Sequence, residues 1–252
     1  MTDYLSNNAK TDKPVAGYEL AIMQLAPSKV AKHRLDDGKI LNTCPDAGAC
    51  VKTCIFSSGR GVSKSVFDAR VWRTKTLINA DGKVNSEALA MLELELAKLN
   101  RSAQKRGLRL AVRLNGFSDL DFVALFGEDF FRRWFDVQFY DYSKSFSRWQ
   151  QHLDGTLPSN YDITFSVNEN RTLESLMPII TAKHKRPARV AMVSRNVATT
   201  LVALRESYFG VWAQDGDQHD ATFTWPTGTI LVLAAKGKGG SRNPEVTAFI
   251  PA

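Results

Sequence analysis

From residue 108 onward, short apolar segments typical of β-strands alternate with amphipathic segments typical of α-helices. The expected strands are LRLAVRLN (108–115), DVQFYDYS (136–143), YDITFSVN (161–168), ARVAMVSR (188–195), VWAQDGD (211–217) and GTILVLAAKG (228–237). Strands separated by helices pair in parallel, because a parallel pair needs a long crossover. With KILNT (39–43) as an opening strand, the chain has about six βα units of roughly 25–30 residues each. We therefore expect an α/β fold with a largely parallel sheet, barrel-like or doubly wound, and favour a partial or full βα barrel.

Two helices are expected before this alternation begins. Apolar residues recur at helical spacing through residues 65–79. A longer amphipathic helix is expected over 85–107, with Asn85 or Ser86 as its N-cap and Gly107 at its end.

Length and hydropathy indicate one domain outside the membrane. A chain of 252 residues can bury a large core, so we expect a single barrel-like domain over 17–252, preceded by a flexible arm over 1–16. No apolar run approaches the about 20 residues that a membrane span needs. The polar start MTDYLSNNAKTDK also lacks the core of a signal peptide, so we expect a cytoplasmic protein.

The chain is basic, with a net charge of +7. Such a charge favours an anionic partner, either an anionic small molecule or nucleic acid. The alternative is that the basic surface only keeps the protein soluble. The candidate anion-binding residues are Arg60, Lys64, Lys144 and Lys236.

Polar residues gather where each expected strand ends. The endings are Asn115, Ser118 and Asp119; Tyr140, Asp141 and Tyr142; Ser166, Asn168 and Glu169; Ser194, Arg195 and Asn196; and Asp215, Asp217 and Asp220. In parallel α/β folds the loops at the carboxyl ends of the strands converge on one crevice, which carries the ligand and the chemistry. The alternative is that these residues are helix N-caps and turn formers. The candidate catalytic residues are Asp119, Tyr140, Asp141, Glu169 and Asp217; the candidate cofactor-binding residues are Asn115, Ser118, Ser166, Asn168 and Arg195.

All three cysteines of the chain lie within eleven residues, Cys44, Cys50 and Cys54, in a loop rich in Gly and Pro. Clustered cysteines in a reducing compartment are more often metal ligands or reactive thiols than disulfides. One interpretation is a 4Fe-4S iron–sulfur cluster held by three thiolates, with one iron open. A second is a zinc site completed by a residue such as His33, Asp46 or His219. A third is that small buried thiols only fill space.

A three-cysteine cluster in the loop after the first strand of a partial βα barrel resembles the arrangement of radical S-adenosylmethionine enzymes. The spacing here is C-x5-C-x3-C, whereas the usual spacing of those enzymes is C-x3-C-x2-C. The resemblance implies S-adenosylmethionine as a cofactor, whose amino and carboxylate groups bind the open iron. Arg195 could then pair with a carboxylate as a two-pronged donor.

The order of motifs along the chain resembles a second family, of phage and plasmid proteins, named after a mycobacteriophage gene 88 protein. The motifs are NTCPDAGACVKTC followed by GRG, then VRLNGFSDLDF, FDVQFYDYSK, SNYDITFSVNEN, a late DGD and a terminal LAAKGKG. The matching positions are Cys44, Cys50, Cys54, Arg60, Arg70, Asn115, Ser118, Asp119, Tyr140, Asp141, Tyr142, Lys144, Ser166, Glu169, Asp215, Asp217, Asp220 and Lys236. This resemblance implies a phage or mobile-element origin and a bacterial host cell, and it implies no particular reaction.

Two hypotheses follow. The first is a metalloenzyme with an iron–sulfur cluster, similar to radical S-adenosylmethionine enzymes, acting on an anionic or nucleic-acid-related substrate. The second is a basic nucleic-acid- or protein-binding factor in which the cysteines hold a structural zinc ion and no chemistry takes place. The sequence gives no indication of an oligomeric state.

Overall fold

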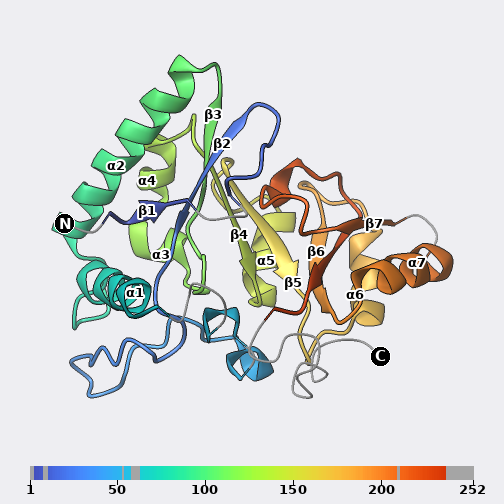
Figure 1. Cartoon of the computed structure of the whole chain (residues 1–252), viewed down its shortest axis with the longest axis horizontal. Helices are drawn as coiled ribbons and strands as arrows, with labels where there is room; N and C mark the ends of the chain where they lie inside the picture. The colour runs from blue at the N-terminus through green and yellow to red at the C-terminus, as the bar shows by residue number, and fades with distance from the viewer. Residues whose placement is uncertain (1–2, 8–10, 53, 58–62, 209–210, 237–252) are drawn as a thin grey trace.

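The computed structural model describes residues 3–7, 11–52, 54–57, 63–208 and 211–236, which form an α/β fold around an eight-stranded sheet (Figure 1). The strands are β1 (Leu5–Ser6), β2 (Tyr18–Met23), β3 (Arg109–Arg113), β4 (Gln138–Ser143), β5 (Tyr161–Ser166), β6 (Arg189–Ser194), β7 (Trp212–Asp215) and β8 (Thr229–Ala234). The α-helices are α1 (Lys64–Leu77), α2 (Ser86–Lys105), α3 (Phe122–Phe126), α4 (Glu128–Arg133), α5 (Phe146–Leu153), α6 (Leu173–Ile180) and α7 (Val197–Ser207). Short 3-10 turns include η1 (Gly48–Val51), η2 (Ile55–Ser57) and η4 (Thr222–Thr224).

The sheet is mostly parallel, which confirms the prediction drawn from the alternation of strands and helices. Its order is β1-β2-β3-β4-β5-β6-β8-β7, and only β1 pairs antiparallel, with β2. The strands β1 and β7 lie at the two edges, and no pairing joins these edges among the strands that the structure describes. The sheet is therefore open in the described part of the chain.

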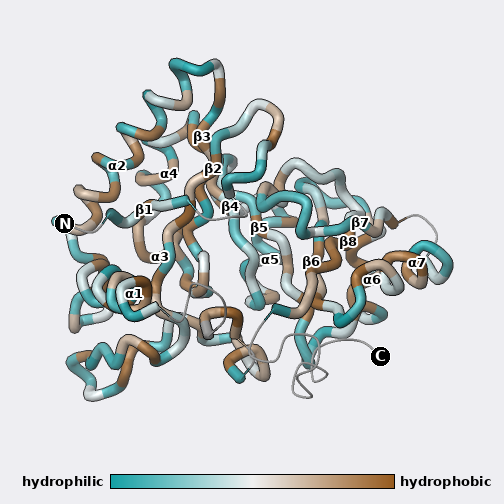
Figure 2. Tube along the Cα trace, in the orientation of Figure 1, coloured by the Kyte–Doolittle hydropathy of each residue, from teal (hydrophilic) through white to brown (hydrophobic). Residues whose placement is uncertain are grey.

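Side chains alternate between the two faces of the sheet, as strand geometry requires. On β3, Leu110 and Val112 pack into the large core beneath the helices, which includes Leu96 of α2. Ala111 lies on the opposite face, in a small cluster with Tyr140. Figure 2 shows the matching pattern of hydrophobic central strands and alternating hydropathy along α2.

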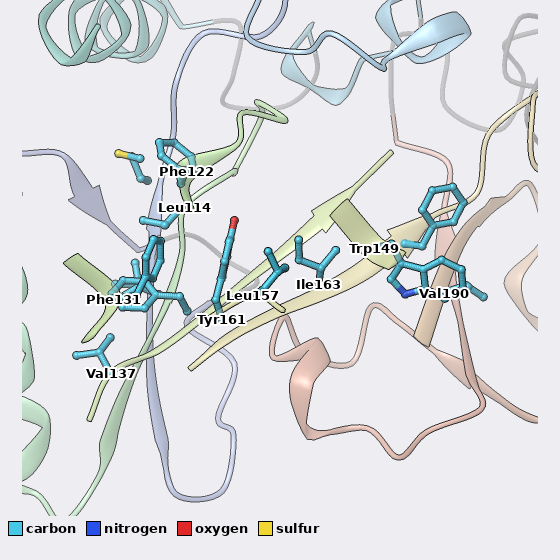
Figure 3. Packing of buried hydrophobic residues seen from close by; sticks show 14 of the residues in the cluster. Leu114, Phe122, Phe131, Val137, Trp149, Leu157, Tyr161, Ile163 and Val190 are labelled. Atoms are coloured by element: carbon cyan, nitrogen blue, oxygen red, sulfur yellow. The ribbon is translucent and has the colours of Figure 1, made fainter. Parts of the chain in front are cut away.

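The large core is rich in aromatic side chains, part of which Figure 3 shows. Phe131 of α4 stacks on Tyr161 of β5 with ring centroids 5.1 Å apart, and Trp149 of α5 stacks on Phe165 at 5.2 Å. These contacts fasten helices to strands, so the carboxyl ends of the strands form a rigid platform for their loops.

The first parallel strand differs from the expected one. Residues 39–43 form no strand, and Ile40 makes only an isolated bridge with Arg34. The position next to β3 is taken by β2, because four consecutive residues of YELAIM are buried there, whereas residues 39–42 stay partly exposed. The cysteine loop still follows the first parallel strand, now after a longer connection.

Part of the expected N-terminal arm packs against the domain. Leu5–Ser6 pair with β2, and the amide groups of Tyr4 and Leu5 donate hydrogen bonds to Glu95 of α2 at 2.9 and 2.8 Å. The buried ring of Tyr4 contacts Trp72 of α1. Burial of an aromatic ring outweighs the mostly polar composition of this segment.

The expected helix ends are those observed for α2. The side chain of Asn85 accepts hydrogen bonds from the amides of Glu87 and Ala88, and Gly107 adopts a φ of 70° just beyond the helix. No helix in the described ranges is long and apolar enough to cross a membrane.

Candidate functional site

A pocket of about 320 Å³ opens at the carboxyl ends of the parallel strands. Loops after β2, β3, β4, β5, β7 and β8 contribute to its wall, as expected for a parallel α/β sheet. In the view of Figure 1, the segment with η1 and η2 lies below the central strands. The predicted residues that line the pocket are Cys44, Cys50, Cys54, Ser118, Asp119, Tyr142, Lys144, Ser166, Asp217 and Lys236.

Cys44 is buried and held between the loops that follow β2 and β3. Its Sγ accepts a hydrogen bond from the amide of Ser28 at 3.3 Å and donates to the carbonyl of Phe117 at 3.3 Å. The neighbouring Thr43 joins the same two loops: its hydroxyl donates to the carbonyl of Ala26 at 2.7 Å, and its carbonyl accepts from the amide of Asp119 at 2.7 Å.

Cys50 and Cys54 are partly buried, one in η1 and the other just before η2, and no disulfide joins any of these three described cysteines. Burial raises the pKa of each thiol, that of Cys54 to about 11. Repulsion from Cys50 adds a smaller contribution that also raises the pKa of Cys44 and of Cys54. Without a metal, the three thiols are therefore neutral near pH 7.

The thiols are not preassembled around a single ion. Within the described ranges, no group of three or more His, Cys, Asp or Glu side chains is arranged to hold one metal ion. A structural zinc ion needs four such ligands at one centre. All three thiols line the same pocket, and three thiols are the kind of donor set that could hold an iron–sulfur cluster.

Glu169, which follows β5, holds the turn that carries Cys50. Its Oε1 accepts a hydrogen bond from the amide of Ala49 at 2.8 Å. A Cβ atom on Gly48 would overlap this carboxylate. The predicted catalytic carboxylate therefore contacts the cysteine loop and positions its η1 turn.

Asp119 is buried and bound by protein partners. Arg148 of α5 forms an ion pair with its Oδ1, and the amide of Lys144 donates to its Oδ2 at 2.8 Å. Arg148 also donates to the carbonyl of Leu120 at 2.6 Å and to the hydroxyl of Ser143 at 2.7 Å. Asp119 thus fastens the loop after β3 to the end of β4, and the N-cap of the following α3 is Asp121.

Lys144 places a positive charge in the pocket wall. Its Nζ donates to the hydroxyl of Ser166 and to the carbonyl of Val167, both at 3.1 Å. Burial lowers the pKa of Lys144, while the nearby Cys50 and Asp119 raise it. The ammonium group is close enough to Cys50 to lower the pKa of that thiol in return.

Asn115 and Asp141 lie beneath the pocket, outside the lining that the described residues form. The amide and the side-chain Nδ2 of Asn115 donate to Asp141 at 2.6 and 3.0 Å, and the hydroxyl of Tyr161 donates at 2.6 Å. Burial raises the pKa of Asp141 to about 6 against the effect of these bonds. Asn115 also accepts from the hydroxyl of Ser118 at 2.7 Å, so this network shapes the pocket floor.

Tyr140 points to the face of the sheet opposite the large core. Its hydroxyl donates to Asp220 at 3.2 Å, and Arg113 of β3 forms an ion pair with the same carboxylate at 3.2 Å. Arg113 lines the pocket and lies over the ring of Tyr142, 4.6 Å from its centroid. Sequence reasoning missed Arg113, although strand alternation alone puts it on the same face as Ala111.

The remaining predicted residues lie elsewhere. Asn168 is buried and accepts a hydrogen bond from the amide of Asn170, whereas Arg195 is exposed, and neither belongs to the lining formed by the described residues. Lys64 is exposed and pairs with Asp68 within α1. Arg60 lies outside the described residues. At the pocket edge, Lys236 pairs with Asp217 at 2.6 Å.

A model of a protein family described as gene product 88 matches residues 4–248, almost the whole chain. Neither the curated proteins nor the solved structures contain a match. The family match confirms the resemblance seen in the order of the sequence motifs.

Proposed function

The chain belongs to the gene product 88 family, and from this premise we propose that its strand-end pocket is the reaction site of a phage or mobile-element metalloenzyme. In this proposal Cys44, Cys50 and Cys54 hold an iron–sulfur cluster. The observation that carries it is that all three cysteines of the chain line the same pocket.

The position of the thiols supports chemistry similar to that of radical S-adenosylmethionine enzymes. The cysteine loop follows the first parallel strand of an open sheet and precedes the first long helix, α1. When bound, a cluster with three protein ligands supplies electron transfer and an open iron for a small-molecule cofactor such as S-adenosylmethionine. Within the spacing C-x5-C-x3-C, the turn η1 carries Cys50.

The chain's own residues would bind and orient an anionic substrate beside the thiols. Lys144 and Arg113 contribute positive charge to the wall, and Tyr142 offers an aromatic face beneath Arg113. The apolar side chains of Val193 and Leu233 also line the pocket. This combination suits an anionic molecule with an apolar or aromatic part, including a nucleotide-like one.

Anaerobic purification followed by iron, sulfide and zinc analysis tests the proposal. We expect iron and acid-labile sulfide in equal amounts, and we expect loss of both in Cys44→Ser, Cys50→Ser and Cys54→Ser. Lys52→Ala is the matched control, because Lys52 is exposed on the same loop. Protein that carries one zinc and no sulfide would overturn the proposal and favour the zinc-containing binding factor. That alternative also requires binding to DNA or RNA that weakens steeply with salt.

A further inference from the structure

Arg70 of α1 lies directly behind the cysteine loop. Its side chain is only 4% exposed, and its guanidinium carbon lies 4.0 Å from the ring centroid of Phe117 and 5.2 Å from that of Phe56. Phe56 follows Cys54 by two residues, and the carbonyl of Phe117 accepts the hydrogen bond from Cys44. The guanidinium group is thus packed between the two segments that carry or contact the thiols.

The hydrogen bonds of Arg70 bring no opposite charge to its guanidinium group. Its Nε and Nη2 donate to the side-chain oxygen of Gln24 at 3.2 and 2.9 Å, which is a neutral acceptor. Its Nη1 is buried and donates to no partner, and no carboxylate forms an ion pair with Arg70, among the residues that the structure describes. A buried charge without an opposite charge is strongly destabilising, so such groups are normally paired.

Arg73, on the same helix, shows what ordinary compensation looks like. It is also buried, at 8% exposure, and burial lowers its pKa, but its Nε donates to the carbonyl of Asp3 at 2.6 Å and the carboxylates of Glu95 and Asp3 act against the lowering. For Arg70, burial and then Arg73 lower the pKa, to about 10, and only Cys54 acts in the opposite direction. Among the described residues, the potential anion that favours the charged form of Arg70 is therefore the sulfur of Cys54.

We propose that Arg70 is a positioning residue whose positive charge compensates the thiolates that hold the metal centre, Cys54 above all. This inference rests on the proposed function, because the thiols bear negative charge only when they bind metal. In the metal-free protein Arg70 is a buried cation that packs on two aromatic rings and has no carboxylate partner within the described ranges. In the loaded protein it faces the anionic centre and stabilises it.

Two consequences follow for the loaded protein. A nearby cation stabilises the more negative, reduced form of a cluster, so Arg70 raises its midpoint potential. Arg70 also couples metal loading to folding, because its charge destabilises the metal-free state and stabilises the loaded one. A guanidinium that only packs between two aromatic rings would do neither.

The test compares Arg70→Met, Arg70→Gln and Arg70→Lys with the control Arg73→Met, each as the full chain. The midpoint potential of the cluster is measured by redox titration, and the thermal midpoint is measured for metal-free and loaded protein. We expect Arg70→Met and Arg70→Gln to lower the midpoint potential and to reduce the rise in thermal midpoint on loading. Arg70→Lys should retain most of the midpoint potential and most of the rise in thermal midpoint on loading. Arg73→Met should lower the thermal midpoint by the same amount in the metal-free and in the loaded protein.

The outcomes separate this inference from the proposed function. Wild-type protein that binds no iron and sulfide overturns both. Wild-type protein with a cluster whose potential is unchanged in Arg70→Met and Arg70→Gln overturns the inference alone. If Arg70→Met does not fold, the midpoint potential is measured on Arg70→Gln, which retains a polar group for Gln24. An equal loss of stability in both states of each folded variant assigns Arg70 a packing role and also overturns the inference.

Discussion

The carboxylate of Glu169 occupies the space that a side chain on Gly48 would need. Gly48 opens the η1 turn with a φ of 50°, and the amide of its neighbour Ala49 donates to Glu169. The end of β5 and the cysteine loop therefore meet through a residue without a Cβ atom. This contact fixes the position of Cys50 relative to the sheet.

Gly48→Ala should release the η1 turn and reduce the retention of metal. The added Cβ atom is strained at this φ, by about 1–2 kcal/mol, and also displaces the carboxylate of Glu169. Gly38→Ala is the control, because Gly38 has a φ of 81° and open space around it. We expect both variants to lose a similar amount of thermal stability, measured by calorimetry, and only Gly48→Ala to lose metal. Equal metal content in the two variants would contradict this role of Gly48.

Asp141 should make the protein less stable as the pH rises from about 4 to about 6. Its folded pKa of about 6 lies above the ordinary value of 3.8, so the folded state holds this proton more tightly than the unfolded state. The stabilisation is complete below the unfolded pKa and is lost as the pH rises through the folded one, by up to about 3 kcal/mol. Urea unfolding of wild type and Asp141→Asn between about pH 3.5 and about pH 7.5 isolates this group.

The difference between the two unfolding curves cancels other groups such as His152, whose pKa burial lowers. We expect the wild-type free energy of unfolding to fall with pH relative to that of Asp141→Asn. A difference that stays constant, or that rises with pH, would show that the hydrogen bonds from Asn115 and Tyr161 outweigh burial.

Arg148→Met should destabilise the fold by about 3–5 kcal/mol, because it leaves the carboxylate of Asp119 buried without its cation. The control is Arg132→Met, since Arg132 pairs with Asp129 at 2.6 Å on the surface, where an ion pair contributes at most about 1 kcal/mol. Denaturant unfolding measures both. Addition of Asp119→Asn to Arg148→Met should restore part of the loss. Similar effects of the two arginine variants would rule out the buried ion pair as a major contributor.

Much of the sheet could be predicted from the sequence, because the strands after residue 108 are short apolar segments separated by helices. The first parallel strand was the exception. YELAIM is richer in apolar residues than KILNT, but it lies far before the alternation that begins at residue 108, so its pairing with β3 is visible only in the folded sheet. The packing of the N-terminal arm could not be predicted for the same reason, because the burial of Tyr4 depends on its contact with α1, far along the chain.

The pocket was predictable as a place, whereas the connections within it were not. Strand order and alternation bring Ser118, Lys144 and Ser166 to one edge of the sheet, and this follows from topology alone. The pairing of Asp119 with Arg148 depends on the rotation of α5. That Nη1 of Arg70 has no hydrogen-bond partner among the described residues depends on how α1 packs against the loops. Neither property is local to a motif.

Tyr140→Phe should cost about 1–2 kcal/mol of stability and leave metal retention unchanged. The variant removes one donor from Asp220, a buried carboxylate that Arg113 continues to pair. Tyr208→Phe is a matched control, because Tyr208 donates to Glu174 at the same 3.2 Å distance near the surface, where water replaces the lost donor. Denaturant unfolding and iron analysis of the two variants check the prediction. Equal stability of the two variants would show that the phenol of Tyr140 is not held for structural reasons, and would favour the catalytic role first predicted for it.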